Sequence, residues 1–501
     1  MAAEVASAHM GMNGIKSTPA QLYYLWPAQK QEFKQFSHFC WIDLAHVVML
    51  VEQGTVDRDV GQKLLPSLQD IREQGYQRLP IDPFKESLLF QVEGALSQKH
   101  GDRVAGALHT ARSRIDQRAT AGRMYHRDLL LQAMDRIQQF QACLVNAAKK
   151  HSGRLVPYYT HMQQAQPGNF GHYLLAFAAK LQEDFERCQE AYRRVNRNPL
   201  GTVGRSGTGL RIERQRTTQL LGFDSPIHNS LLGRDADYAA DIVAALSFVM
   251  YHLNDFATDM HVWATSEFGY IQLPEAYCAT SSIFPQKRNP VTLEVIKCAA
   301  GPATSWLAST LSTFRGEGTG DQKVHGAPAH LQSSIDTTSD MLELACLVVD
   351  AIEFNDDRIK QVFANTWSTT SNLSDTLMQS HGLSIREAYS VVKRVVRHSI
   401  DNGITRSQVT PELVRQASLD VLDNTEIEMS VEELHLALDP EGFVKTRTSS
   451  GSVGPAEVQN LILAAEEMLS ENKEWSRERR EQLSTAESQL EEAVAQILKG
   501  I

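Results

Sequence analysis

The stretch that decides the fold runs from Ile242 to Trp263 and reads I-V-A-A-L-S-F-V-M-Y-H-L-N-D-F-A-T-D-M-H-V-W. Its apolar residues recur at steps of three and four, which places their side chains along one face of an α-helix. The stripe consists of Ile242, Leu246, Val249, Leu253, Phe256, Met260 and Trp263. It continues for about six turns, which is long for a globular helix and typical of a helix bundle.

Similar stripes occupy 124–150, the segment from His172 onward, and about 291–315 and 332–353. Strand-like alternation is nearly absent, and the breakers fall between the stripes at Pro157, Pro167, Pro199, Pro274 and Pro285. These patterns predict an all-α fold with a central bundle of long helices and smaller helical domains at either end. We predict an N-terminal domain over 1–108, the bundle over 109–364 and a C-terminal domain over 365–501. Bundle helices usually leave apolar faces to bury, so oligomerisation is expected.

The two ends of the chain carry shorter helical patterns. One covers Phe39 to Glu52 and is ended by Gly54, and a basic amphipathic helix is predicted from Ser384 to Asn402. A charged terminal helix is predicted over about 455–498, where the spacing of Glu and Arg indicates a solvated face.

Composition excludes several classes of function. The chain has 501 residues, a formal net charge of -11 and 42% hydrophobic residues, so nucleic-acid binding is not expected as its main activity. No apolar run approaches membrane-spanning length, and the first twenty residues lack the apolar core of a secretory signal. Six scattered cysteines without a C-x-x-C pair indicate free thiols and no zinc motif. These features predict a cytoplasmic protein that binds no membrane.

The segment from Thr280 to Ile296, T-S-S-I-F-P-Q-K-R-N-P-V-T-L-E-V-I, carries the strongest chemical signal. Serine is a weak base unless a neighbouring cation stabilises its alkoxide, and Lys287 lies close enough in sequence to Ser281 to do so. A loop of this composition can also close over a substrate and exclude water. The alternative is an ordinary polar loop that leads into a helix.

Two other segments carry groups that suit a dicarboxylate. In H-T-A-R-S-R-I-D-Q-R-A-T, from His109 to Thr120, two arginines flank Ser113 just before a helix, which suits a bidentate grip on a carboxylate. The alternative is that these charges only cap the helix. In Y-T-H-M-Q-Q-A-Q-P, from Tyr159 to Pro167, Thr160 and His161 are predicted at the mouth of a long helix, although a lone histidine is more often structural.

Together these segments resemble a known family. The serine segment resembles the Gly-Ser-Ser-x-Met-Pro-x-Lys-x-Asn-Pro signature of the fumarase/aspartase superfamily, with Thr280 for Gly and Phe284 for Met. The arginine segment is similar to the H-T-G-R-S-R-N-D-Q of argininosuccinate lyases, and the histidine segment resembles their Y-T-H-x-Q-x-A-Q-P. The likeness extends from about residue 20 to 470, and it favours argininosuccinate lyases over other branches of the superfamily.

The resemblance implies a homotetramer with a twenty-helix core, five helices per subunit, and active sites assembled from three subunits. It implies reversible β-elimination from an N-substituted aspartate, which gives fumarate and an amine without a metal or organic cofactor. Ser281 would remove the β-carbon proton, Lys287 would support the aci-carboxylate intermediate, and His161 with Thr160 would orient the substrate and protonate the nitrogen. The substrate-binding residues implied are Thr110, Arg112, Ser113, Gln166, Ser282, Asn289 and Lys323.

The departures from the family concentrate on the amine side. Ile115 replaces the family's Asn, and D-A-D-Y at 235–238 lacks the arginine of D-R-D-F. The family's Y-N-K-D-L-Q-E-D-K is matched by D-Q-K-V-H-G-A-P-A at 321–329, which keeps only Lys323 of its named contacts.

These departures lead to three hypotheses. The first is a carbon–nitrogen lyase for an N-substituted aspartate other than argininosuccinate, such as a succinylated diamine or another aminopolycarboxylate. The second is an ordinary argininosuccinate lyase with an unusual pocket. The third is a non-catalytic protein like the lens crystallins related to this family. The intact Ser281, Lys287, Asn289 and His161 argue against the third hypothesis.

Overall fold

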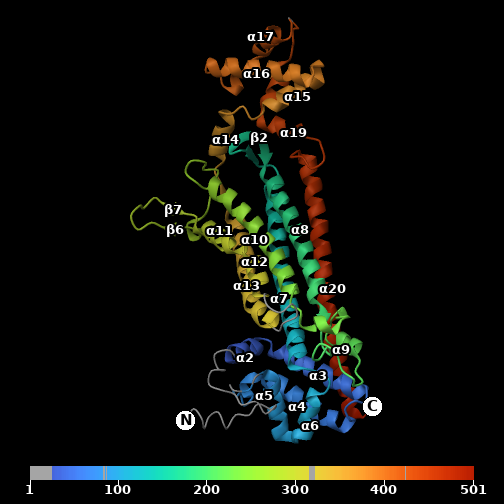
Figure 1. Ribbon diagram of the computed structural model, residues 1–501. Helices are drawn as coiled ribbons and strands as arrows, with labels where there is room; N and C mark the ends of the chain where they lie inside the picture. The colour runs from blue at the N-terminus through green and yellow to red at the C-terminus, as the bar shows by residue number, and fades with distance from the viewer. Residues whose placement is uncertain (1–24, 83–84, 86, 315–321, 424, 501) are drawn as a thin grey trace.

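The computed structural model describes residues 25–82, 85, 87–314, 322–423 and 425–500, with 25–29 and 322–329 described by backbone alone. It is an elongated helical molecule with the long helices in its middle and smaller helical groups at its two ends (Figure 1). The predicted all-α fold is therefore confirmed. Among the described helices, none carries an apolar stretch long enough to cross a lipid bilayer.

The central bundle is built from the segments with the strongest periodicity. Its long helices are α7 (Arg114–Lys150), α8 (Phe170–Val195), α10 (Tyr238–Trp263) and α13 (Gln322–Ala351). The apolar stripe of α10 is buried along its whole length and forms one core with side chains of α7 and α8. Two shorter helices, α11 (Val291–Ala303) and α12 (Trp306–Thr313), pack against α10 and α13.

One predicted helix proved to be two. The stripe expected over about 291–315 ends at Ala303 and resumes at Trp306, so a single helix there was wrong. Pro302 lies in the last turn of α11, where it removes a backbone donor and favours an end to the helix. The helix expected from about 332 begins ten residues earlier, at Gln322.

The N-terminal helices surround a separate apolar core. They are α2 (Leu25–Lys34), α3 (Phe36–Glu52), α4 (Arg58–Gln74), α5 (Leu88–His100) and α6 (Asp102–Gly106), with 3-10 turns at Tyr76–Arg78 and Ala107–His109. The predicted helix from Phe39 to Glu52 is α3, which is buried along most of its length and is followed by Gly54 at a φ of 67°.

The helices that follow residue 355 lie at the other end, where apolar side chains between Leu373 and Leu438 form a third core, whereas those of the first helix join the bundle core. They are α14 (Asp356–Ala364), α15 (Thr370–His381), α16 (Ile385–Asp401), α17 (Pro411–Val421), α18 (Val431–Leu438) and α19 (Pro440–Lys445), with a 3-10 turn at Arg406–Gln408. The predicted amphipathic helix is α16, whose capping box pairs Ser384 with Glu387.

The terminal helix α20 (Pro455–Lys499) connects both ends of the molecule (red in Figure 1). Its first half contributes Val458, Ile462 and Leu469 to the bundle core, and its last turns contribute Leu490 and Ile497 to the N-terminal core. The sequence analysis predicted a solvated face for this helix and did not identify the buried stripe on its other side. The predicted boundaries at 108/109 and 364/365 stay a prediction, and the packing of α20 crosses both of them.

Short strands pair in four places in the described chain. A hairpin joins β1 (Leu155–Thr160) to β2 (Gln163–Asn169). Pairs of two residues join β3 (Arg197–Asn198) to β4 (Ser225–Pro226), β5 (Ile271–Gln272) to β8 (Glu353–Phe354), and β6 (Ala279–Thr280) to β7 (Arg288–Asn289). The remaining short elements are α9 (Arg214–Leu220) and the 3-10 turns Ser230–Arg234 and Glu275–Tyr277.

Candidate functional site

The serine segment forms a loop that β6 and β7 hold away from the bundle (Figure 1). Thr280 pairs with Arg288, so residues 281–287 form the tip of a two-stranded ribbon. Ile283 is 76% exposed and Phe284 is also exposed, although both are large apolar side chains. An exposed tip of this kind can close over a ligand or pack against a neighbouring surface. The predicted helix that follows it is α11.

The oxygen of Ser281 already has two donors. Its Oγ accepts hydrogen bonds from the backbone N–H groups of Ile283 at 3.3 Å and Phe284 at 3.0 Å. Backbone donors aimed at one oxygen stabilise negative charge there, which favours the alkoxide that a serine base requires. Ser282, the neighbouring hydroxyl, is exposed on the same tip.

Lys287 is held by its neighbour on β7. Its Nζ donates to Asn289 Oδ1 at 2.6 Å, and Asn289 Nδ2 donates to the carbonyl of Ala279 at 3.2 Å. The amide therefore ties the ammonium group to the base of the ribbon. The described contacts contain no hydrogen bond between Lys287 and Ser281. The loop thus brings Ser281, Lys287 and Asn289 onto one short segment without a direct contact between base and cation.

The arginine segment builds the start of α7. Ser113 is its N-cap, and the backbone N–H of Ser113 donates to Asp116 Oδ1 at 2.8 Å. The other oxygen of Asp116 accepts from the backbone N–H groups of Gly201 at 3.0 Å and Val203 at 2.9 Å. Burial raises the pKa of Asp116 to about 6, although these backbone donors oppose the shift. The carboxyl therefore fixes the first turn of α7 to the loop that follows α8.

Arg112 lies buried beside a carboxylate of α3. Its side chain is 0% exposed, and its Nη1 lies 2.7 Å from Asp43 Oδ1, which also accepts from Gln117 Nε2 at 2.7 Å. Burial raises the pKa of Asp43, and the nearby Arg112 opposes that shift. The Nε and Nη2 atoms of Arg112 have no hydrogen-bond partner among the described residues. The guanidinium group of Arg112 therefore lies inside the protein, and its Nε and Nη2 donors can still bind another acceptor.

Thr110 is fixed through its backbone. Its carbonyl accepts a hydrogen bond from His46 Nε2 at 2.7 Å. Burial, with a smaller effect from the positive Arg112, lowers the pKa of His46 to about 3, so this ring is neutral near pH 7. Ala111 then takes a positive φ of 57°, a conformation that favours the glycine found at this place in the family motif. Strained backbone of this kind persists where surrounding contacts enforce it.

The histidine segment is a β-hairpin, so its predicted place at the mouth of a helix was wrong. Thr160 ends β1, and His161 and Met162 form the two-residue turn, with φ values of 53° and 57°. Two positive φ values are the signature of the hairpin turn that matches strand twist, which usually takes Asn or Gly. The turn leaves Thr160 and His161 exposed, and α8 begins only at Phe170.

The hairpin also contacts the C-terminal helices. Gln166 Nε2 donates to Ser371 Oγ in the first turn of α15 at 3.2 Å. Beside it lies an open pocket of about 690 Å³, whose lining includes Met162, Gln164, Tyr270, Arg358 and Trp367. The pocket gives the hairpin turn a neighbouring concave surface with a mixed polar and apolar lining. It does not include Ser281.

The three segments lie apart within one chain. The ribbon projects beside the middle of the bundle, the hairpin lies at the end near α14 and α15, and α7 starts at the opposite end near α3 (Figure 1). Among the described residues, no hydrogen bond or ion pair joins any two of these segments. Lys323 lies on α13, where only the backbone is described, so its predicted contact falls outside the described side chains. The same holds for the rest of 322–329.

Sequence reasoning missed the carboxyl groups that support the site. Asp43 lies on α3, for which the sequence predicted only a short helix, and it is far from Arg112 in the sequence. Asp116 was within a quoted motif, yet only its spacing from Ser113 indicated a capping role. The one sequence signal for Asp43 was an acidic residue within an otherwise apolar helical stretch.

Comparison with known proteins agrees with this architecture. The sequence pattern of a family described as "Lyase" matches residues 42–304, and one described as "Argininosuccinate lyase C-terminal" matches 367–445. An argininosuccinate lyase from Methanocaldococcus jannaschii is 33% identical over 429 residues, which cover 85% of this chain and 87% of that protein. One from Methanococcus aeolicus is 35% identical over 426 residues, with 85% of each covered.

A solved structure is also similar throughout. The crystal structure of EDDS lyase in complex with formate superimposes with a TM-score of 0.82 at 29% identity, over 96% of each chain. A similar match is found for a variant of EDDS lyase with bound fumarate, with a TM-score of 0.82. The chain therefore belongs to the argininosuccinate lyase family of the fumarase/aspartase superfamily, and it is a carbon–nitrogen lyase.

Proposed function

We propose that the protein releases fumarate from an N-substituted aspartate other than argininosuccinate, with Ser281 as the base. The observation that carries the proposal is the ribbon tip, where two backbone N–H groups point at Ser281 Oγ and Asn289 holds the Lys287 ammonium. Removal of a proton beside a carboxylate leaves two negative charges on the aci-carboxylate. Closure of the tip would bring a cation and N–H donors to that charge.

The remaining groups are proposed to act from other subunits. Because the ribbon, the hairpin and the start of α7 lie apart in one chain, a site that uses all three needs more than one copy. The bundle offers a face for such contacts: Phe248 and Tyr251 on α10, Val295 on α11 and Leu311 on α12 are all exposed. Apolar faces of this kind are buried in stable oligomers. A homotetramer with shared sites fits both observations.

Roles for the other segments follow from this assembly. His161 and Thr160, exposed at the hairpin turn, would orient the substrate and deliver a proton to the leaving nitrogen. Ser113, Thr110, Gln166 and Ser282 would contact carboxylates. Arg112 would reach one only if its remaining donors become open to the site, because it is buried beside Asp43 in the single chain. The ion pair with Asp43 supports a role for Arg112 in positioning the start of α7.

The amine side supports a substrate different from argininosuccinate. Ile115, in place of the family's Asn, is buried in the first turn of α7, two residues after Ser113. The aligned stretch 321–329 lacks the family's Tyr, Gln and second Lys. Loss of hydrogen bonds to a charged partner costs roughly 1.5–3 kcal/mol each, so two losses weaken recognition by orders of magnitude. The similarity to EDDS lyase favours an aminopolycarboxylate such as a succinylated diamine.

A second candidate is argininosuccinate itself. It is favoured by relatives of that name, which are 33% and 35% identical over most of the chain. The two candidates share the Ser281 chemistry and differ only in the amine, so a substrate comparison separates them.

The test is an amine screen of the purified protein against fumarate, in which addition is followed by loss of fumarate's ultraviolet absorbance. Cleavage of argininosuccinate is measured alongside. We expect turnover with at least one diamine or amino acid, and cleavage of argininosuccinate slower by at least about 100-fold, as the loss of two charged hydrogen bonds requires. Efficient argininosuccinate cleavage would establish the second candidate instead. An absence of turnover with every amine and with argininosuccinate would contradict both.

A further inference from the structure

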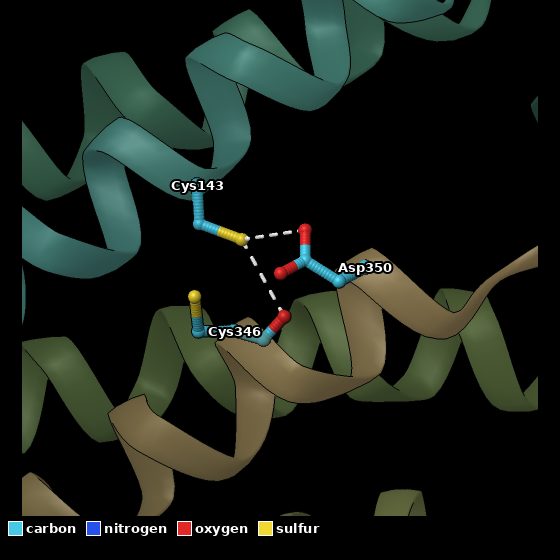
Figure 2. A group of neighbouring side chains, drawn as sticks. All are labelled: Cys143, Cys346 and Asp350. Carbon is cyan, nitrogen blue, oxygen red and sulfur yellow. Dashed lines mark hydrogen bonds between the residues drawn. The ribbon is translucent and has the colours of Figure 1, made fainter.

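Three side chains with metal-binding atoms meet between α7 and α13, and none of them belongs to the segments that carry the proposed reaction (Figure 2). Cys143 projects from α7, and Cys346 and Asp350 project from α13 toward it. The two sulfur atoms and a carboxylate oxygen of Asp350 all lie within 4.8 Å of one another. Cys346 and Asp350 are four residues apart, which places them on the same face of α13.

The spacing fits a tetrahedral metal ion. Zinc–sulfur bonds of about 2.3 Å and zinc–oxygen bonds of about 2.1 Å at tetrahedral angles put a sulfur and an oxygen ligand about 3.6 Å apart. Cys143 Sγ lies 3.5 Å from Asp350 Oδ1. The third ligand atom lies within the same 4.8 Å limit, which is compatible with all three binding one ion once the side chains adjust.

The surroundings also suit a cation. Cys143 is only 7% exposed, Cys346 is half-buried and Asp350 is exposed, so the group runs from the bundle core to its surface. Asp350 forms no ion pair with a Lys or Arg in the described part of the chain. Its contact within the group is with the Cys143 thiol, which also lies 3.4 Å from the carbonyl oxygen of Cys346. An ion could enter from the Asp350 side, and a water could complete its coordination.

We propose that Cys143, Cys346 and Asp350 form a binding site for a thiophilic divalent cation of the Zn²⁺ type, which links α7 to α13. Two thiolates select such an ion over Mg²⁺ or Ca²⁺, which prefer oxygen ligands. Binding releases the two thiol protons and involves no redox step. The site takes no part in the elimination, and it is independent of the proposed function.

Co²⁺ is the probe, because thiolate ligands give it an intense charge-transfer absorption in the near ultraviolet. The full-length protein, kept reduced and freed of metal, is titrated with Co²⁺ and then with Zn²⁺. We expect the charge-transfer band to saturate at one Co²⁺ per chain and to disappear as Zn²⁺ displaces it. A wild-type protein that gives no such band would overturn the site.

Variants show whether these three residues supply the ligands. Asp350→Asn changes an exposed side chain, so it preserves the fold, and together with Cys346→Ser it tests both ligands from α13. Each is expected to weaken Zn²⁺ binding by more than about 100-fold, since even the loss of an outer-shell partner costs 10–100-fold. The matched control is Cys298→Ser, which removes an exposed thiol on α11 and should leave the titration unchanged.

The opposite pattern would reject the proposal. If Cys346→Ser keeps the band while Cys298→Ser loses it, the ion binds elsewhere. If the band is absent and mild oxidation removes two thiols from the wild type but none from Cys346→Ser, the cysteines form a disulfide pair and not a metal site.

Discussion

At the scale of single residues, the ribbon tip makes Ser281 the group on which turnover depends. Ser281→Ala removes the base but little else, because this hydroxyl accepts only local N–H bonds on an exposed loop. We expect the rate to fall by at least about 10²–10⁴-fold while the melting temperature is unchanged. Steady-state kinetics with the best amine from the screen, beside thermal unfolding, measure the two effects.

The control for that variant is Ser312→Ala, which removes a serine hydroxyl that bonds only to a carbonyl within α12. Its activity should equal the wild-type value. Activity close to normal in Ser281→Ala would transfer the role of base to another group, with His161 the first to test.

At this scale the sequence indicated candidate groups, and their roles stay predictions. Ser281, Lys287 and Asn289 were predicted together because their segment resembles the superfamily signature, and the structure holds Lys287 on Asn289 without a direct contact to Ser281. The buried position of Arg112 was not predictable, because its partner Asp43 comes from a different helix. A local motif indicates which chemistry a side chain can perform. Which partner that side chain contacts depends on tertiary packing, because the partner can come from a distant part of the sequence.

At the scale of elements, the ion pair between Asp43 and Arg112 joins α3 to the start of α7. Asp43→Asn keeps the side chain's shape but leaves a guanidinium buried without its counter-charge. Breaking a buried pair from one side costs about 3–5 kcal/mol, so the free energy of unfolding should fall by that amount. Denaturant unfolding followed by circular dichroism measures it.

The double variant Asp43→Asn with Arg112→Gln provides the matched comparison. Removing both charges should recover part of the lost stability, so the double variant is expected to be more stable than Asp43→Asn alone. Two costs that simply add would show that the charges do not interact as the structure places them.

Helices were predictable where apolar spacing was regular, and the failures have physical causes. The β1–β2 hairpin was not predicted because its second strand, Gln163 to Asn169, contains mostly polar residues and shows no alternation of polar and apolar side chains. Its turn uses His161 and Met162 where Asn or Gly would have signalled a hairpin. The break between α11 and α12 was not predicted because the helical spacing of apolar residues continues across Pro302. Periodicity records which face is buried, and it does not record where the backbone bends.

At the scale of the whole molecule, the separation of the three segments predicts that inactive variants can rescue each other. Ser281→Ala and His161→Asn are each expected to be nearly inactive. When equal amounts are unfolded and refolded together, random assembly gives about a quarter of the sites both intact groups, provided that these groups come from different subunits. We therefore expect roughly a quarter of wild-type activity.

The control is the same mixture combined without unfolding, which should stay inactive if the proposed tetramers exchange subunits slowly. No recovery after joint refolding, in a sample that regains the mass of the untreated protein, would place Ser281 and His161 in the same subunit. The arrangement of subunits could not be predicted from the spacing of apolar residues, because it depends on which surfaces of separate copies meet.

The path of α20 has a consequence for how the protein is made. Leu490 and Ile497 of α20 complete an apolar core that includes many side chains of α3, α4 and α5. A ribosome makes those first helices hundreds of residues before it reaches α20. The core around α3 is therefore completed only after α20 has been synthesised. Until then part of its apolar surface lacks a cover, which exposes the growing chain to chaperones and to aggregation.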